Sequence, residues 1–248
     1  VMQDSIFGHA GKNILVEECL FGTELSFMGI LTPQEFIPFE TSVDYKPLYD
    51  GNNGPNTGGM GCISPSPFMN NKLKKTVIKK VVEPTIKGLK SLGIEYYGFM
   101  YFGLMVKDND PKLLEFNCRL GDPETQCLMM QMDSDLVDNL LDALDNKAVN
   151  INWKTGASMG VVVASEGYPG NYKTGCSVEF GNTRDLKIFH AGTKVIDGAL
   201  KTNGGRVFSA NYHDKSLDIC SEYIYKNIEE IRFDGNIYRR DIGKIYES

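Results

Sequence analysis

The first forty residues alternate between short apolar segments and turn residues, a pattern typical of antiparallel strands. Residues 13–18 (NILVEE), 22–31 (GTELSFMGIL) and 35–39 (EFIPF) are rich in β-branched or aromatic side chains. Glycine or proline separates these segments. We therefore expect three strands that form a meander.

Between residues 71 and 92 the apolar residues recur every three or four positions, with lysines on the opposite side. The positions that define this period are Leu73, Val77, Val81, Leu89 and Leu92. Gly93 is placed to cap the end, and Pro84 is expected to bend the segment. The pattern predicts one amphipathic helix.

An apolar hairpin and a second helix follow. Residues 97–106 and 112–117 flank the turn KDNDP and are apolar on both faces, which predicts a central pair of strands. Leucine and valine recur at helical spacing over residues 136–144. Ser134 or Asp133 is the expected N-cap of that helix.

The regular pattern breaks at NINWKTG (residues 150–156), and we place a domain boundary there. The two parts are residues 1–152 and 153–248. The first has antiparallel strands with helices packed on one side, and the second is a small domain of strands and one long helix. The sequence therefore predicts an α+β fold in two domains.

The second part contains short strands joined by tight turns. Within TNGGRVFSANY, Asn203-Gly204 is a typical two-residue hairpin signal. Apolar residues between Leu217 and Ile231 recur at three-and-four spacing and predict the final helix.

Composition limits the function. The chain has 248 residues, 42% of them hydrophobic and 23% charged, with a net charge of −6. A chain of this length buries one large core or two modest ones. The acidic balance removes the electrostatic driving force for general binding to nucleic acid or a membrane surface. Any anionic substrate must be bound by local positive groups.

The six cysteines lie at positions without C-x-x-C or zinc-ligand spacing. Reduced thiols in the cytoplasm are the simplest interpretation. No apolar run reaches the length of a membrane span. The first residues lack the features of a signal peptide, and Val1 followed by Met2 is unlike a natural N-terminus.

The segment GPNTGGMG (residues 54–61) has four glycines in eight positions. Glycine amides can approach a ligand closely, and successive backbone N–H groups can bind an anion. Asn56 and Thr57 add polar side chains. The spacing is neither that of the P-loop nor that of the dinucleotide fingerprint. On composition alone, the segment is either a surface loop or an anion-binding loop.

A second polar constellation lies in LLEFNCRLGDPETQ. Glu115 and Asn117 are two residues apart on an expected strand, so both side chains leave the same face. Their oxygens suit a magnesium-type cation that also binds nucleotide phosphates, although such a pair is common by chance. Arg119 suits capture of a carboxylate or phosphate, and the alternative is an Arg119–Asp122 ion pair that fixes the loop.

The chain carries, in this order, GPNTGGMG, EFNCRLGDPETQ, GYPGNY, FHAGTKV and TNGGRV. Their order and spacing resemble those of the phosphoribosylamine–glycine ligase family of the ATP-grasp superfamily, over essentially the whole chain. The resemblance implies the second half of an ATP-grasp domain followed by a small C-terminal domain. It also implies a reaction of purine biosynthesis: ATP, glycine and 5-phosphoribosylamine give glycinamide ribonucleotide, ADP and phosphate through a glycyl phosphate.

The resemblance also implies site residues. Glu115 and Asn117 match metal ligands for Mg²⁺ or Mn²⁺, and Arg119 and Asp122 match the loop that holds glycine. The residues implied for phosphoribosylamine are Asn56, Thr57, Gly58, Gly59, Met60 and Lys46. Those implied for ATP are Glu18, Cys19 and Leu20 at adenine and Glu24 at the ribose.

The sequence departs from the family in two ways. Tyr45 and Pro47, on either side of Lys46, differ from the usual DHKR, so one positive group is missing there. The chain also starts after the family's N-terminal domain and first ATP-grasp half, and it stops near the family's usual end. We therefore expect the missing N-terminal part of the same enzyme as a partner, beside the small-molecule substrates, and little activity from these residues alone.

Two alternatives stay open. One is an inactive nucleotide-binding or structural fragment of the ligase. The other, which the glycine-rich segment disfavours, is another ATP-grasp carboxylate–amine ligase or a carboxylase-like relative. Four further residues are interpreted as structural. His190 and His213 are expected to be hydrogen-bonded structural histidines, Cys118 a small buried apolar residue, and Arg206 a support for its hairpin.

Overall fold

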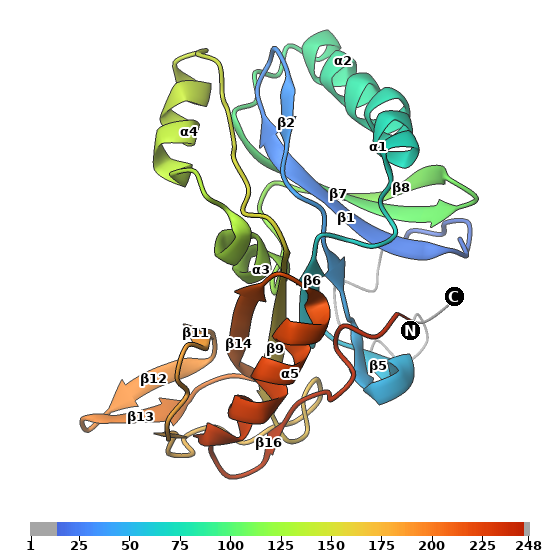
Figure 1. Ribbon diagram of the computed structural model, residues 1–248. Coiled ribbons are helices and arrows are strands. Elements are labelled where there is room, and N and C mark those ends of the chain that lie inside the picture. The colour runs from blue at the N-terminus through green and yellow to red at the C-terminus, as the bar shows by residue number, and fades with distance from the viewer. Residues whose placement is uncertain (1–13, 246–248) are drawn as a thin grey trace.

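The computed structural model describes residues 14–245 and has an α+β fold (Figure 1). Its first sheet is antiparallel, in the order β2 (Phe36–Pro38), β1 (Thr23–Leu31), β7 (Gly98–Lys107) and β8 (Asp110–Asn117). The expected hairpin is therefore present. Of its two strands only β7 lies in the interior of the sheet, because β8 forms the edge and leaves Phe116 half exposed.

A continuous helical segment covers one face of this sheet (Figure 1). It consists of α1 (Asn71–Val77), a π-helical turn (Ile78–Val82) and α2 (Glu83–Ser91). Pro84 has no N–H and cannot donate the usual α-helical hydrogen bond to the preceding turn. The wider π turn lies at this position. Gly93 follows the end of the segment with φ 68°, as expected for a helix terminus. The predicted single helix is confirmed.

Helices lie against both faces of the sheet, whereas the sequence pattern predicted one. Phe27 of β1 is buried in the core under α1 and α2. Its neighbour Met28 points to the opposite face, in a cluster that includes side chains of α3 (Glu124–Gln131) and α4 (Leu136–Leu144). Because successive strand residues alternate between faces and both sets are apolar in β1, each face needs a cover.

The second sheet joins distant parts of the chain. It runs β11 (Lys187–His190), β14 (Arg206–Asp214), β9 (Ala157–Ser165), β6 (Gly61–Ser64) and β3 (Val43–Asp44), and β16 (Asn236–Ile237) also pairs with β9. Helix α5 (Leu217–Asn227) packs on β9 and β14. Strands from before and after residue 152 thus share one sheet, while the domain division at 152/153 stays a prediction.

Three two-stranded ribbons complete the fold: β4 (Pro47–Tyr49) with β5 (Asn53–Asn56), β10 (Glu179–Phe180) with β15 (Ile231–Arg232), and β12 (Thr193–Ile196) with β13 (Ala199–Thr202). Short 3₁₀ turns span Asp50–Asn52 and Ile228–Glu230.

The expected hairpin at Asn203-Gly204 is wrong. These residues connect β13 to β14, but β13 pairs with β12, and β14 pairs with β9 and β11. The two-residue hairpin turn of this region is Asp197-Gly198, whose φ values of 51° and 75° fit a left-handed turn.

Two other local expectations are corrected. Residues 14–18 form no strand, and the side chains of Leu15 and Val16 are 80% and 82% exposed; residue 13 lies outside the described residues. The N-cap of α4 is Asp135, whose carboxylate accepts hydrogen bonds from the amides of Val137 and Asp138. Within residues 14–245 no helix has the length and apolarity needed to span a membrane.

Candidate functional site

A cavity of about 490 Å³ opens between the N-terminal segment and the first sheet. Strands β1, β7 and β8 and residues Asp44 and Lys46 form its walls. Its lining contains Glu17, Glu18, Leu20, Glu24, Leu25, Ser26, Asp44, Lys46, Tyr101, Gly103, Leu104, Lys112, Leu113, Leu114 and Glu115. Five of the residues singled out in the sequence, which are Glu18, Leu20, Glu24, Lys46 and Glu115, therefore face one space.

Glu115 and Asn117 lie side by side on β8. The amide nitrogen of Asn117 donates to Glu115 Oε1 at 3.0 Å, so the predicted common face is confirmed. Among the described residues no group of three or more His, Cys, Asp or Glu side chains could hold a metal ion. Two hard oxygen donors at a cavity rim fit a magnesium-type ion that takes its other ligands from phosphates and water.

The segment predicted to bind adenine lies at the other side of the cavity. Glu18 and Leu20 line it, whereas Cys19 is exposed and lines an adjacent hollow with both of them. Glu18 forms an ion pair with Lys112 of β8 at 3.5 Å. Lys112 also lines the cavity. It was not singled out in the sequence, because a lysine next to a turn carries no specific functional signal.

Lys46 is held by an acidic neighbour. Its Nζ lies 2.6 Å from Glu24 Oε2. Burial lowers the pKa of Lys46, but the hydrogen bond to Glu24 and the nearby carboxylates of Asp44 and Glu115 outweigh burial and raise it. The site thus keeps a charged lysine next to the predicted metal ligands and the predicted ribose ligand.

The glycine-rich loop is held by its own hydrogen bonds. The amides of Thr57 and Met60 donate to the carbonyls of Lys46 and Tyr45, and the amide of Gly59 donates to Thr57 Oγ1. The amide of Gly58 donates to Tyr168 Oη at 2.9 Å. These four N–H groups are therefore engaged within the protein, and a bound anion would have to be met by other groups or would have to displace them.

Gly59 cannot carry a side chain. Its φ is 110°, and an added Cβ would collide with Pro123 and lie 2.5 Å from Asp44 Oδ1. The glycine-rich loop therefore approaches both β3 and the GDPE segment as closely as backbone allows.

Arg206 joins the two motifs, which corrects its interpretation as a hairpin support. Its Nη1 donates to the carbonyl of Gly58 at 2.5 Å and to that of Asp122 at 2.7 Å, and its Nη2 lies 3.2 Å from Asp122 Oδ2. Asp122 Oδ1 also accepts from Gln126 at 3.0 Å. The alternative Arg119–Asp122 pair does not form, because Asp122 faces Arg206 and the Arg119 guanidinium donates to the Leu120 carbonyl.

We expect Arg206→Met to loosen the glycine-rich loop, because hydrogen bonds to a charged donor are lost. Amide hydrogen exchange at residues 57–60 should become about 10- to 100-fold faster. Exchange mass spectrometry is the measurement. Arg232→Met is the control, since Arg232 is exposed and, within residues 14–245, its side chain forms polar contacts only with the nearby Glu229 and Glu230. Unchanged exchange in this loop would show that Arg206 does not hold it.

Two carboxyl groups with little exposure lie at the cavity: Asp44 in its wall and Glu124 outside its lining. Glu124 is 3% exposed and accepts a hydrogen bond from Ser26 Oγ at 2.9 Å; Ser26 also bonds Tyr101 Oη at 2.8 Å. Burial raises the pKa of Glu124. Burial and the repulsion from Glu124 raise the pKa of Asp44 well above its usual value. Sequence reasoning missed both, and the run of acidic residues in GDPET was the only signal for Glu124.

Of the other residues interpreted as structural, Cys118 is exposed rather than buried, because the chain leaves the sheet after Asn117. His190 Nδ1 lies 3.1 Å from Thr193 Oγ1, as expected of a hydrogen-bonded histidine. His213 Nε2 is buried and has no hydrogen-bond partner among the described residues, and burial lowers the pKa of His213.

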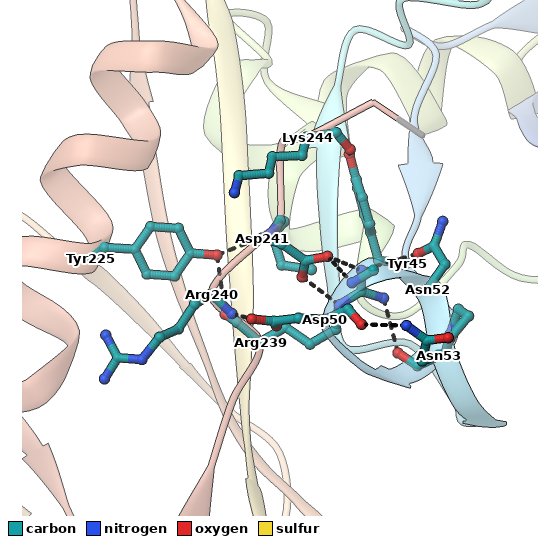
Figure 2. A network of polar contacts seen from close by, with 12 residues as sticks. Tyr45, Asp50, Asn52, Asn53, Tyr225, Arg239, Arg240, Asp241 and Lys244 are labelled. Carbon is teal, nitrogen blue, oxygen red and sulfur yellow. Dashed lines mark hydrogen bonds and ion pairs between the residues drawn. The ribbon is translucent and has the colours of Figure 1, made fainter. Parts of the chain in front are cut away.

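The C-terminal segment holds the ribbon of β4 and β5, whose second strand contains the first residues of the glycine-rich segment (Figure 2). Arg239 is fully buried and forms a two-point pair with Asp241, at 2.7 and 2.6 Å. The same guanidinium donates to the carbonyl of Pro47 and to Asn52 Oδ1. Since Pro47 follows Lys46 directly, this contact fixes one end of the site.

Comparison with known proteins gives a consistent family. Residues 1–125 match the family model described as phosphoribosylglycinamide synthetase, ATP-grasp (A) domain, and residues 158–245 match the C domain of the same synthetase. Phosphoribosylamine–glycine ligases of Clostridium acetobutylicum and Salmonella typhimurium are each 42% identical to the chain over 98% of its length. The chain spans 59% and 58% of these two relatives.

Solved structures agree. The crystal structure of phosphoribosylamine–glycine ligase from Thermotoga maritima is similar with a TM-score of 0.85 at 35% identity, over 91% of this chain and 57% of that one. The biotin carboxylase domain of 2-oxoglutarate carboxylase from Hydrogenobacter thermophilus has a TM-score of 0.61 at 14% identity, over 87% of this chain and 46% of that one. This second likeness concerns the fold alone.

Proposed function

The chain belongs to the phosphoribosylglycinamide synthetase family, and we propose that it is the C-terminal portion of a ligase that joins glycine to 5-phosphoribosylamine at the expense of ATP. The products are glycinamide ribonucleotide, ADP and phosphate, in purine biosynthesis. The observation that carries the proposal is the cavity that gathers Glu18, Leu20, Glu24, Lys46 and Glu115.

ATP occupies this cavity in the proposal. The segment at Glu18, Cys19 and Leu20 reads adenine, and Glu24 meets the ribose hydroxyls. Glu115 and Asn117 hold Mg²⁺ or Mn²⁺, which neutralises phosphate charge when bound. Phosphoryl transfer depends on such positioning and electrostatics more than on covalent chemistry. Lys46 adds a positive charge 2.6 Å from Glu24.

The two other substrates lie at the motifs that Arg206 joins. Glycine is held by Arg119 on its carboxylate and by Asp122, and phosphoribosylamine by Lys46 and the loop from Asn56 to Met60. A carboxylate is a poor acylating agent, so glycine is first converted to glycyl phosphate, which the amine then attacks. The exposed guanidinium of Arg119 supports its role, because it is free to turn toward a ligand.

The site is completed by residues outside this chain, which supply the opposite wall and further positive charge. Six free thiols fit a reducing compartment, and we place the enzyme in the cytoplasm. The alternative is that the chain is an inactive nucleotide-binding or structural fragment of the ligase.

The decisive experiment measures ADP release that requires both glycine and phosphoribosylamine. The complete enzyme that contains this chain should show it, and the 248-residue polypeptide alone should not, because catalysis requires charge stabilisation from both sides of the cleft. Omission of either substrate is the control, and alanine, serine and bicarbonate replace glycine in parallel. Full activity with one of these compounds in place of glycine contradicts the proposal. Absence of ADP release from the complete enzyme also contradicts it.

A further inference from the structure

Asp44 has a carboxylate oxygen without a partner at the wall of the main cavity. The residue lies on β3 and lines both this cavity and a neighbouring one of about 260 Å³. Its Oδ1 is buried and makes no hydrogen bond within residues 14–245. A buried polar atom without a partner destabilises a protein, so an unpartnered acceptor on a residue that lines a cavity points to a ligand with an N–H or O–H group.

The surroundings select a positively charged or N–H-bearing ligand. The buried carboxyl of Glu124 lies close enough to act on Asp44 electrostatically. The nearby cations are engaged elsewhere, since Lys46 pairs with Glu24 and Arg206 pairs with Asp122. Asp44 is thus one of two acidic groups in a low-dielectric site, and no cation within residues 14–245 forms an ion pair with it; an incoming ammonium corrects this balance.

The position of Asp44 relates this acceptor to the glycine-rich loop. A Cβ on Gly59 would lie 2.5 Å from Asp44 Oδ1, so the loop backbone borders the carboxylate directly. A ligand in the main cavity that contacts Asp44 therefore lies next to this loop.

We propose that Asp44 accepts a hydrogen bond from the amino group of a primary-amine substrate, with the buried Glu124 behind it. This inference rests on the proposed function, which supplies two such groups, the ammonium of glycine and the amine of phosphoribosylamine. Both share the chemistry that the site selects, and they are told apart by kinetics.

The pH dependence of stability gives the proposal a second measurement. Because the pKa of Asp44 is raised in the folded state, its contribution to stability is present below its unfolded pKa and is lost as the pH rises through the folded value. The charged groups that act on it are Glu124, Lys46, Arg206 and Glu24. Asp44→Asn carries no such penalty, so the variant should melt at a higher temperature than the unmodified protein at pH 8 and not at pH 4.

The test is steady-state kinetics of the complete enzyme with Asp44→Asn. Losing a charge-assisted hydrogen bond should raise KM for one amine substrate on the order of 10- to 100-fold, with KM for ATP unchanged. A rise for glycine identifies its ammonium as the ligand, and a rise for phosphoribosylamine identifies that amine. Asp145→Asn is the matched control, because Asp145 is exposed and pairs only with Lys147 on the surface.

The outcomes separate this inference from the proposed function. If the unmodified enzyme shows no glycine- and phosphoribosylamine-dependent ADP release, the proposed function fails. If it does, and Asp44→Asn keeps both amine KM values within twofold, the inference is wrong. It is also wrong if Asp44→Asn lowers the melting temperature at pH 8, because the carboxylate then has a structural partner in the native protein.

Discussion

Glu115→Ala should abolish ATP turnover in the complete enzyme while the protein stays folded. Glu115 supplies the charged half of a two-residue oxygen pair, and Asn117 alone cannot offset the charge of a metal ion bound to nucleotide phosphates. We expect kcat/KM to fall on the order of a thousandfold or more, since a metal in this role stabilises the transition state by several kcal/mol. Metal-dependent ADP release measures the effect.

The matched control is Glu222→Ala, an exposed glutamate on α5 that lies outside the cavity lining. The melting temperature of both variants should stay near that of the unmodified protein, because Glu115 is exposed and so is its hydrogen bond from Asn117. Glu115→Gln, which keeps the shape and loses the charge, should resemble Glu115→Ala. If Glu115→Ala turns over ATP within a few-fold of the normal rate, Glu115 is not a metal ligand.

Arg239→Met should produce the largest loss of stability among single substitutions in the C-terminal segment. It removes both bonds to the buried Asp241, the bonds to Pro47 and Asn52, and the cation that lies 5.3 Å from the ring centre of Tyr45. Breaking a buried ion pair from one side typically destabilises by about 3–5 kcal/mol. For a chain of this size that corresponds to a fall in Tm of about 10 °C.

Arg240→Met is the neighbouring control, because the Arg240 guanidinium is largely exposed and its pair with Glu229 lies at the surface. Its effect should be about 1 kcal/mol or less. Urea unfolding of both variants gives the comparison. Replacing the pair together, with Arg239→Met and Asp241→Leu, should recover part of the loss, since no charge is then left buried. Equal small effects of Arg239→Met and Arg240→Met would contradict the buried clamp.

The sequence alone determined the elements whose signals are local. The hairpin of β7 and β8, the helix at residues 136–144 and the common face of Glu115 and Asn117 follow from side-chain periodicity, because their hydrogen bonds join residues that are near in the chain. The motifs GPNTGGMG and EFNCRLGDPETQ were sufficient for the family, which the comparisons confirm. The site roles carried by those motifs stay predictions.

Predictions from short sequence patterns were wrong where two segments carry the same pattern. Asn203-Gly204 and Asp197-Gly198 are both good hairpin turns, and only the pairing of β12 with β13 decides between them. Residues 14–18 resemble a strand in composition, yet no neighbouring strand is available to bond them within the described residues. Strand formation depends on a partner, which composition does not supply.

Only the tertiary structure decided which charged groups meet. Arg206 bonds Asp122 across 84 positions, and Arg239 bonds Pro47 across 192. Asp44 became a candidate ligand because its Oδ1 is buried without a hydrogen bond within residues 14–245, on a strand of the second sheet. In the unfolded chain, water hydrates all arginines and carboxylates, so no particular pairing is favoured. Folding of the sheets removes water from some of them, and an unpaired buried charge is then unfavourable. The tertiary structure therefore selects which groups pair.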